Sequence, residues 1–480
     1  MTDFRTSFVS RFAFWRYRPF RRGLAALTAV AVALAGVGPF PVTPAQAQGQ
    51  ATRGLPVIRD TEIEQLLRDY AQPILKAAGL AKQNVKVVVL NDRAFNAFVM
   101  DGRHIFINAG ALFDAKTPGE IIGVFAHETG HLAGGHLQRL REQLATAQTA
   151  SIIALLLGAG AAVAGARSGS GANVGAAAIL APQSAIQRSL LAYVRTQEDQ
   201  ADHAGVKFLN ATGQSANGML TLFKRLGSES LFNSRNVDPY LQTHPLPAER
   251  VAALETVARQ SPYFNKPDSP ELQARHDMMR AKLSGFLEGP DTVARRFPLS
   301  DHSLPARYAR AISTYRHSDL RNAVGQIDSL IQSQPNNPYF HELKGQALIE
   351  GGRPAEAIAP LRRAAQLSGN APLIQIMLAQ ALIATNNKAV AEEAVALLRT
   401  ALQREPDAPE AYAQLAMAYG RKGDLAQADL AAAQAAFSRG DLMTARQLAS
   451  RAKTRLAVGS PAWVRADDIV NVRPNTNARR

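Results

Sequence analysis

The segment His127-Glu128-Thr129-Gly130-His131 combines two imidazoles and a carboxylate at a spacing that suits metal chemistry. On an α-helix, residues four apart lie on the same face, so His127 and His131 can reach one ion. Glu128 lies one step around the helix, where it can contact a water on the metal without being a ligand. The pattern H-E-x-x-H on a helix is typical of zinc sites that activate water. The segment therefore predicts a hydrolytic zinc site.

A catalytic zinc site needs a third protein ligand and one open position. His136 lies about 140° around an uninterrupted helix from His131, which predicts a surface or supporting histidine rather than a ligand. Glu198 is the better candidate. Glu198 and Asp202 are four residues apart and share a helical face. One of them can therefore bind zinc while the other accepts a hydrogen bond from a ligand imidazole.

One capped helix and two strands must position these residues. Thr117 and Glu120 form a capping-box pattern, and Pro118 stands at the first helical position. A helix that carries the histidines is therefore expected to begin at about 118. The β-branched run 85–90 and the run 104–108, which lies between two glycines, predict strands.

The N-terminus has the pattern of a secretory signal peptide. Arginines precede an apolar run over 23–38, and the small-residue site Ala45-Gln46-Ala47 follows. The run has 16 residues, fewer than the ~20 that span a bilayer, so a membrane anchor is the weaker alternative. We expect export with cleavage near Ala47. Removal of 1–47, with its six arginines and one aspartate, lowers the net charge from +15 to +10.

Composition excludes several classes of function. The chain of 480 residues has no cysteine, which excludes a disulfide scaffold, a cysteine-ligated zinc or iron–sulfur site and a thiol nucleophile. The basic residues are dispersed rather than clustered, and no nucleic-acid-binding motif accompanies them. We therefore expect no nucleic-acid partner.

The second half of the chain is helical in pattern and self-similar. Pro338, Pro372 and Pro409 begin successive units at intervals of 34 and 37 residues. One alanine column keeps these intervals (347, 381 and 418), whereas a later column recurs at 37 and then 34 (357, 394 and 428). A 34-residue period of paired helices resembles tetratricopeptide repeats. The three extra residues of the middle unit are expected near 386–390, between its two helices.

Four motifs in this order resemble the HtpX and CAAX-prenyl-protease type of zinc metallopeptidase, in particular its periplasmic, BepA-like members with a tetratricopeptide tail. The motif H-E-x-G-H is His127–His131, and R-x-x-E-x-x-A-D is Arg195–Asp202. The strand motif N-A-F…G…I begins at Asn96, and T-H-P-x-x-x-x-R spans Thr243–Arg250. The long Gly/Ala-rich insert between the first and second of these helical motifs departs from the family pattern.

The resemblance implies a zinc-dependent metalloendopeptidase. Zn²⁺ would be held by His127, His131 and Glu198, with Glu128 as general base and Asp202 behind a ligand. The implied fold is α+β and mostly helical, a gluzincin-type metallopeptidase domain followed by an α-solenoid of repeats. The expected segments are a signal peptide (1–47), the zinc metallopeptidase domain (55–265), a linker (266–302), the repeat domain (303–456) and a flexible tail (457–480).

The resemblance also implies a substrate class, namely misfolded or misassembled outer-membrane proteins in the periplasm. An extended chain would add as a further strand to the edge of the sheet, which we expect at 104–108. The repeats would recruit unfolded or stalled envelope proteins or the outer-membrane assembly machinery. The alternative function is a chaperone or assembly adaptor in which zinc is structural and proteolysis incidental. Glu128 favours the enzyme, because a structural site has no need of a carboxylate there.

His244 stands in a loop that Pro245 and Pro247 stiffen. Three roles are open for it. The imidazole can occupy the fourth zinc position and make the resting enzyme latent, it can donate to the developing oxyanion, or it can be structural.

The insert contains a charge-free run over 150–166 and an apolar stretch over 174–181. A buried core helix, a lid or hairpin that contacts a membrane or a partner, and a membrane span are the alternatives. The first run is short and glycine-broken for a span.

Overall fold

The computed structural model describes residues 55–149, 171–232 and 239–472. The chain divides into two compact units. The N-terminal unit is formed by 64–276, and the repeat unit is formed by 277 onward together with the described residues up to Ile63. Among the described residues, no helix is both long and apolar enough to cross a membrane. The apolar run 150–166 and the signal-peptide pattern lie outside the described residues.

A small sheet supports the N-terminal unit. Strand β4 (His104–Asn108) pairs in parallel with β2 (Lys86–Leu90) and antiparallel with β3 (Ala97–Asp101). Phe106 on β4 lies opposite Val88 on one side and opposite Phe98 on the other. β4 is therefore an inner strand and β3 stands at the edge. The expectation that 104–108 forms the edge is wrong, because the motif that marks a strand does not reveal which neighbours pair with it.

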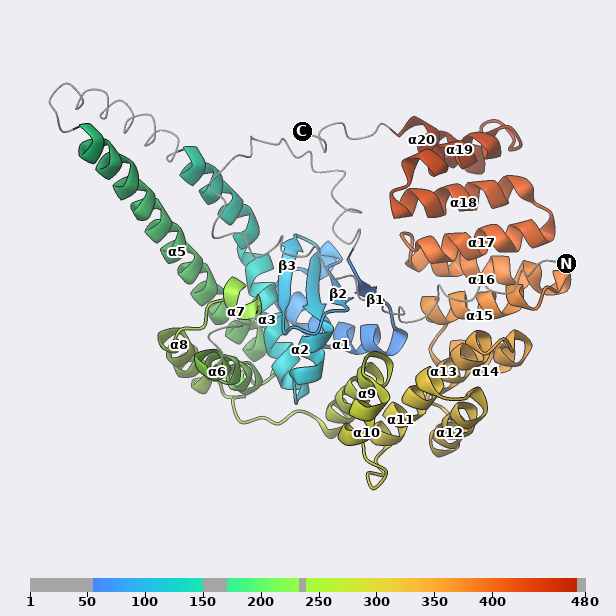
Figure 1. Cartoon of the computed structure of the whole chain (residues 1–480), viewed down its shortest axis with the longest axis horizontal. Coiled ribbons are helices and arrows are strands. Elements are labelled where there is room, and N and C mark those ends of the chain that lie inside the picture. The colour runs from blue at the N-terminus through green and yellow to red at the C-terminus, as the bar shows by residue number, and fades with distance from the viewer. Residues whose placement is uncertain (1–54, 150–170, 233–238, 473–480) are drawn as a thin grey trace. The chain divides into compact units, whose positions relative to one another are not determined.

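The helices of this unit lie beside the sheet (Figure 1). They are α1 (Thr61–Ala77), α2 (Ala109–Asp114), α3 (Pro118–Gly134), α5 (Gly171–Ala211), α6 (Asn217–Phe232), α7 (Pro239–Thr243) and α8 (Ala248–Arg259), with short β1 (Val57–Ile58) before them and the 3-10 turn η2 (Ala81–Gln83) after α1. Helix α3 lies against the sheet, and α5 and α6 pack on α3. A further helical stretch over 136–149 follows α3. The apolar stretch 174–181 lies within α5.

Helix α3 begins at Pro118, as the sequence predicts, but its capping differs from the predicted box. The side chain of Thr117 makes no capping hydrogen bond. Instead the carboxylate of Asp268 accepts from the backbone N–H of Gly119 at 2.9 Å, a favourable place for negative charge. Glu120 accepts from the N–H of Lys116 at 3.1 Å. A distant residue therefore replaces the local cap.

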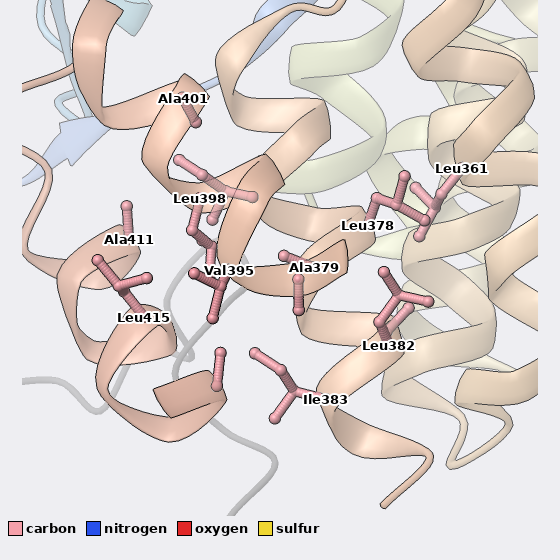
Figure 2. Packing of buried hydrophobic residues seen from close by; sticks show 14 of the residues in the cluster. Leu361, Leu378, Ala379, Leu382, Ile383, Val395, Leu398, Ala401, Ala411 and Leu415 are labelled. Atoms are coloured by element: carbon pink, nitrogen blue, oxygen red, sulfur yellow. The ribbon is translucent and has the colours of Figure 1, made fainter. Parts of the chain in front are cut away.

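The repeat unit is a stack of paired helices (Figure 1). They are α9 (Pro270–Leu287), α10 (Pro290–Arg296), α11 (Leu304–His317), α12 (Leu320–Ser333), α13 (Pro338–Glu350), α14 (Pro354–Leu367), α15 (Pro372–Ala384), α16 (Ala391–Arg404), α17 (Pro409–Lys422), α18 (Leu425–Arg439), α19 (Leu442–Lys453) and α20 (Pro461–Asn471). The three extra residues of the middle unit form the 3-10 turn η3 (Lys388–Val390), where the spacing predicts them. Leucines from successive helices fill the interior, among them Leu382, Leu398 and Leu415 (Figure 2).

Two segments are more ordered than the sequence suggests. The predicted linker contains α9 and α10, whose Phe286 and Val293 share a buried cluster with Tyr308. The predicted flexible tail contains α20, which Ser460 caps and whose Ala466 is fully buried. Alanine-rich helices bury little apolar area per residue, so their packing leaves only a weak signal in the sequence.

Candidate metal centre

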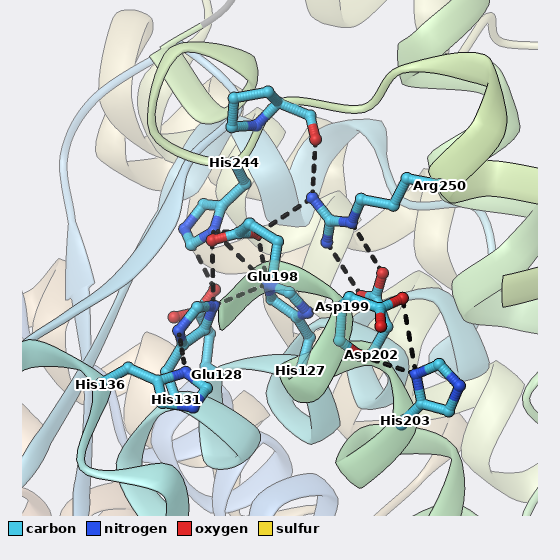
Figure 3. A network of polar contacts seen from close by, with 11 residues as sticks. His127, Glu128, His131, His136, Glu198, Asp199, Asp202, His203, His244 and Arg250 are labelled. Atoms are coloured by element: carbon cyan, nitrogen blue, oxygen red, sulfur yellow. Dashed lines mark hydrogen bonds and ion pairs between the residues drawn. The ribbon is translucent and has the colours of Figure 1, made fainter. Parts of the chain in front are cut away.

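Four buried side chains that can ligate a metal converge in the N-terminal unit (Figure 3). His127 and His131 come from α3, Glu198 comes from α5, and His244 follows α7 directly. One ligand atom from each lies within 4.8 Å of every other. The structure therefore brings together the three predicted ligands and adds His244 to the same cluster.

The spacing of these atoms suits a small tetrahedral ion. Nε2 of His127 lies 3.1 Å from Nε2 of His131. Oε2 of Glu198 lies 3.4 Å from the first of these nitrogens, and Oε1 lies 3.4 Å from the second. Two atoms that each stand about 2.0–2.1 Å from a tetrahedral zinc are roughly 3.4 Å apart. The two nitrogens and the Glu198 carboxylate can therefore share one zinc without a large rearrangement.

Close approach of two helices makes this convergence possible. A side chain at Gly130 would place its Cβ 2.7 Å from the backbone oxygen of Ala201 on α5. Only glycine allows α3 and α5 to approach this closely. This close approach brings Glu198 and Asp202, on either side of Ala201, next to His127 and His131, on either side of Gly130.

A clamp behind His127 fixes its orientation. Nδ1 of His127 lies 2.9 Å from Oδ1 of Asp202, as expected for an imidazole that donates to a carboxylate. Arg250 donates to both oxygens of Asp202, at 2.7 and 2.9 Å. Arg250 also lies 2.9 Å from Glu198. In the sequence, Arg250 is recognisable only as the last residue of a family motif, and its role in holding Asp202 was not predicted.

The charges of the cluster favour a cation. Burial opposes ionisation of Glu198, but His244 and His127 lower the pKa of this carboxyl well below its ordinary value. Burial likewise opposes ionisation of Asp202, and its hydrogen bonds to Arg250 and His127 lower its pKa. Burial alone would lower the pKa of His127, yet its contacts with Asp202 and Glu198 raise it to about 9. Both carboxyl groups are therefore ionised at neutral pH.

Glu128 is a buried acid next to the first ligand histidine on α3. It is fully buried, and neither carboxylate oxygen has a hydrogen-bond partner among the described residues. Its Oε1 lies 3.6 Å from Nε2 of His244. Burial raises the pKa of Glu128, although the neighbouring His244 and His127 act against this shift. A buried acceptor without a hydrogen-bond partner lowers the free energy of unfolding. Such a carboxylate fits the role of a base that takes a proton from a water or a substrate.

His136 is buried, which excludes the surface alternative and leaves the supporting one. Helix α3 ends at Gly134, and Gly135 takes a left-handed φ of 63°. The chain therefore turns, and the angle expected for an uninterrupted helix does not apply. Nδ1 of His136 lies 3.0 Å from Nδ1 of His131. Burial lowers the pKa of His136, and nearby Arg139 adds to the shift.

His244 sits at the end of a short turn of helix. Its backbone N–H donates to the carbonyl of Tyr240 at 2.7 Å, and the two rings lie 4.7 Å apart. Nδ1 of His244 is 3.4 Å from Nε2 of His127 and 3.0 Å from Glu198. The imidazole therefore lies at the position that a fourth ligand would take.

Sequence comparisons agree with this geometry. Residues 58–258 match peptidase family M48, and residues 308–372 match the tetratricopeptide repeat. The first match contains all of the ligand candidates, and the second falls within the stacked helices.

Three relatives carry related names. Proteins named beta-barrel assembly-enhancing protease occur in Yersinia pestis, with 24% identity over 75% of this chain and 73% of the relative, and in Escherichia coli, with 22% identity over 68% and 66%. A Vibrio cholerae relative with a provisional version of that name is 28% identical over 59% of this chain, and the chain spans 58% of its length. These findings confirm the resemblance that the motifs predict. The chain thus carries a metallopeptidase domain of peptidase family M48 followed by tetratricopeptide repeats, and it is a homologue of proteins named beta-barrel assembly-enhancing protease.

Proposed function

We propose that this protein is an exported zinc endopeptidase that degrades misfolded or misassembled outer-membrane proteins. The observation that carries the proposal is the buried carboxylate of Glu128, which has no hydrogen-bond partner among the described residues and lies beside three ligand groups at tetrahedral spacing. His127, His131 and Glu198 would hold Zn²⁺. A structural zinc site gains nothing from a carboxylate without a hydrogen-bond partner at this place. In a hydrolytic zinc site of this type, the same carboxylate serves as the general base.

The chain's own residues supply the proton transfers. Zinc in this site would provide Lewis-acid polarisation of the scissile carbonyl and a water with a pKa near neutrality. Glu128 accepts the proton of the attacking water and returns it to the leaving amine. The raised pKa of Glu128 suits this role, because a base that must also act as an acid works best when its pKa approaches the working pH. Asp202 and Arg250 keep His127 oriented throughout.

The substrate would bind as an added strand on β3. This edge strand replaces 104–108 in the proposal, since β4 is paired on both sides. Unfolded or stalled envelope proteins offer a free backbone for such pairing and folded proteins do not. The repeats would recruit these proteins or the outer-membrane assembly machinery, and the names of the relatives support this assignment. A cleaved signal peptide at 1–47 would deliver the protein to the periplasm.

His244 would make the resting enzyme latent by occupying the fourth ligand position. Its nitrogen lies at ligand-like distances from His127 and Glu198, which supports this role over a purely structural one. A histidine that donates to the oxyanion would also have to lie near the reacting carbonyl. The position of His244 therefore does not separate latency from oxyanion stabilisation, but the effect of its removal on activity does.

The proposal is tested by proteolysis of an unfolded β-barrel protein and of the same protein folded in detergent. We expect the mature full-length protein to cleave only the unfolded form, to lose activity with a chelator and to regain it with added zinc. Cleavage that persists after complete zinc removal would contradict the enzyme. Prevention of aggregation without any cleavage would favour the chaperone alternative instead.

A further inference from the structure

The two histidines of α3 have different partners behind them. Nδ1 of His127 faces the carboxylate of Asp202, which is common at metal sites. Nδ1 of His131 faces instead the imidazole of His136, at 3.0 Å. The two rings of His131 and His136 stand nearly perpendicular, at 85°, with centroids 5.0 Å apart. This is the geometry of a hydrogen bond between ring nitrogens rather than of stacking (Figure 3).

Two consecutive glycines build this contact. The left-handed φ of 63° at Gly135 turns the chain at the end of α3 and returns His136 towards His131. The ring of His136 then lies over Gly134, where an added Cβ would meet Nε2 of His136 at 2.2 Å. Any side chain at 134 would therefore displace the imidazole. The local backbone is shaped to hold His136 at this place.

The position of the proton follows from the ligand geometry. His131 presents Nε2 to the cluster, so as a ligand it must carry its proton on Nδ1 and donate it. Nδ1 of His136 must then be the acceptor, which leaves the proton of a neutral His136 on Nε2. Imidazole is a neutral acceptor, unlike Asp202. The site already holds the carboxylates of Glu128, Glu198 and Asp202, and a neutral partner adds no fourth negative charge.

We propose that His136 is a positioning residue that holds His131 in the tautomer and orientation that bind metal through Nε2. The inference rests on the proposed function, because it assigns a partner to one of the proposed zinc ligands. His136 touches neither the metal position nor the substrate. It acts through His131, by accepting one hydrogen bond, and its own ring is also hydrogen-bonded to Gln200 on α5.

Two substitutions separate the accepted hydrogen bond from the volume of the ring. His136→Leu fills the space without an acceptor, whereas His136→Asn places an amide oxygen near the position of Nδ1. His203→Asn is the matched control, because His203 lies on α5, the helix that carries Glu198, but its side chain is half-exposed and its hydrogen bond and ion pair are with Asp199. Each full-length variant is loaded with zinc, and its zinc dissociation constant is measured by competition with a chelator.

We expect His136→Leu to raise the zinc dissociation constant about 10- to 100-fold, the usual effect of losing a partner behind a ligand. His136→Asn should retain most of the affinity, and His203→Asn should match the wild type. Equal losses in the Leu and Asn variants, or full affinity in the Leu variant, would overturn the proposal. A wild type that binds no zinc would instead contradict the proposed function.

A second measurement does not depend on how the variants fold. In ¹⁵N NMR spectra of the histidine-labelled, zinc-loaded wild type, His131 should carry its proton on Nδ1 and His136 should carry a proton on Nε2 only. Scalar and through-space correlations within the wild-type spectra assign the signals of the two rings. A proton on Nδ1 of His136 would overturn the inference even if both His136 variants unfolded.

Discussion

Arg250 grips Asp202 with two nitrogens, Nε to Oδ2 at 2.7 Å and Nη2 to Oδ1 at 2.9 Å. Both residues are more than nine-tenths buried. Their pairing keeps Asp202 ionised and aimed at His127, so the zinc site depends on a residue that is not a ligand.

Loss of this clamp should weaken both the fold and the metal site. Arg250→Gln leaves the Asp202 carboxylate buried without its charge partner, which typically destabilises a protein by about 3–5 kcal/mol. We expect a lower melting temperature and weaker zinc binding, with Arg250→Lys intermediate because it retains the charge but not the two-point contact. Arg259→Gln on the same helix is the control, since Arg259 is 61% exposed. Similar losses in Arg250→Gln and Arg259→Gln would contradict the clamp.

The ligand assignment predicts an order of effects on zinc affinity. Glu198→Ala removes a ligand, whereas His136→Ala removes only a partner behind a ligand. We therefore expect the purified mature protein to bind about one zinc, and Glu198→Ala to weaken binding at least tenfold more than His136→Ala. Metal analysis combined with chelator competition measures both. Equal losses would mean that the ligands are wrongly assigned.

His244→Ala distinguishes latency from oxyanion stabilisation. If the imidazole blocks the fourth position, its removal should raise basal cleavage and self-degradation while zinc is retained. An oxyanion donor predicts the opposite, a loss of about 10²- to 10³-fold in turnover. Cleavage rates on casein and the appearance of self-cleavage fragments provide the readout. A variant that is less active than the wild type on every substrate would exclude latency.

A buried charge cluster in the repeat unit gives a pH-dependent stability. The ammonium of Lys282 is 3% exposed and lies 2.7 Å from Asp60 and 3.2 Å from Glu62. Glu342 lies 3.9 Å from the same ammonium and accepts from Thr61 at 3.1 Å. Two further rings complete the surroundings: Tyr308, whose hydroxyl donates to Glu62, and Tyr339, which lies under the ammonium. One positive charge thus faces three carboxyl groups.

Burial raises the pKa of Glu342 to about 7. The negative charge of Asp60 adds to this rise, and the positive charge of Lys282 opposes it. The pKa of Glu342 is higher in the folded than in the unfolded chain. Its contribution to the free energy of unfolding is therefore full at pH below about 4.5 and is lost as the pH rises through about 7. The free energy of unfolding should fall between pH 5 and 7.5, and we expect Glu342→Gln to make this fall smaller by about 3 kcal/mol at most. Urea unfolding at both pH values measures this difference. Glu356→Gln, at an exposed position, should leave it unchanged, and an unchanged slope in Glu342→Gln would contradict the assignment.

The sequence predicts the parts of the site that helical periodicity determines. His127 and His131 are four residues apart on one helix, and so are Glu198 and Asp202, so each pair shares a face whatever the rest of the chain does. The contact of His136 depends on a left-handed turn at Gly135, and an uninterrupted helix would have carried the ring away. A glycine after a helical segment was the available signal.

Long-range contacts could not be predicted in this way. The strand pattern of β4 is visible in the sequence, but its place between β2 and β3 depends on pairing partners distant along the chain. The expected domain end at 265 fails for a similar reason. Asp268 caps α3, and the buried His276 contacts Tyr70 and the carbonyl of Ala115, so the N-terminal unit continues past that point.

The most direct test of the central claim is to measure zinc content and turnover in one sample of Glu128→Gln. Because Glu128 acts as a base and not as a ligand, this variant should bind one zinc per chain as the wild type does, yet cleave at least about 10²-fold more slowly. Glu271→Gln, at an exposed position on α9, should show neither change. A Glu128→Gln variant that keeps its zinc and cleaves at the wild-type rate would contradict the proposed active site.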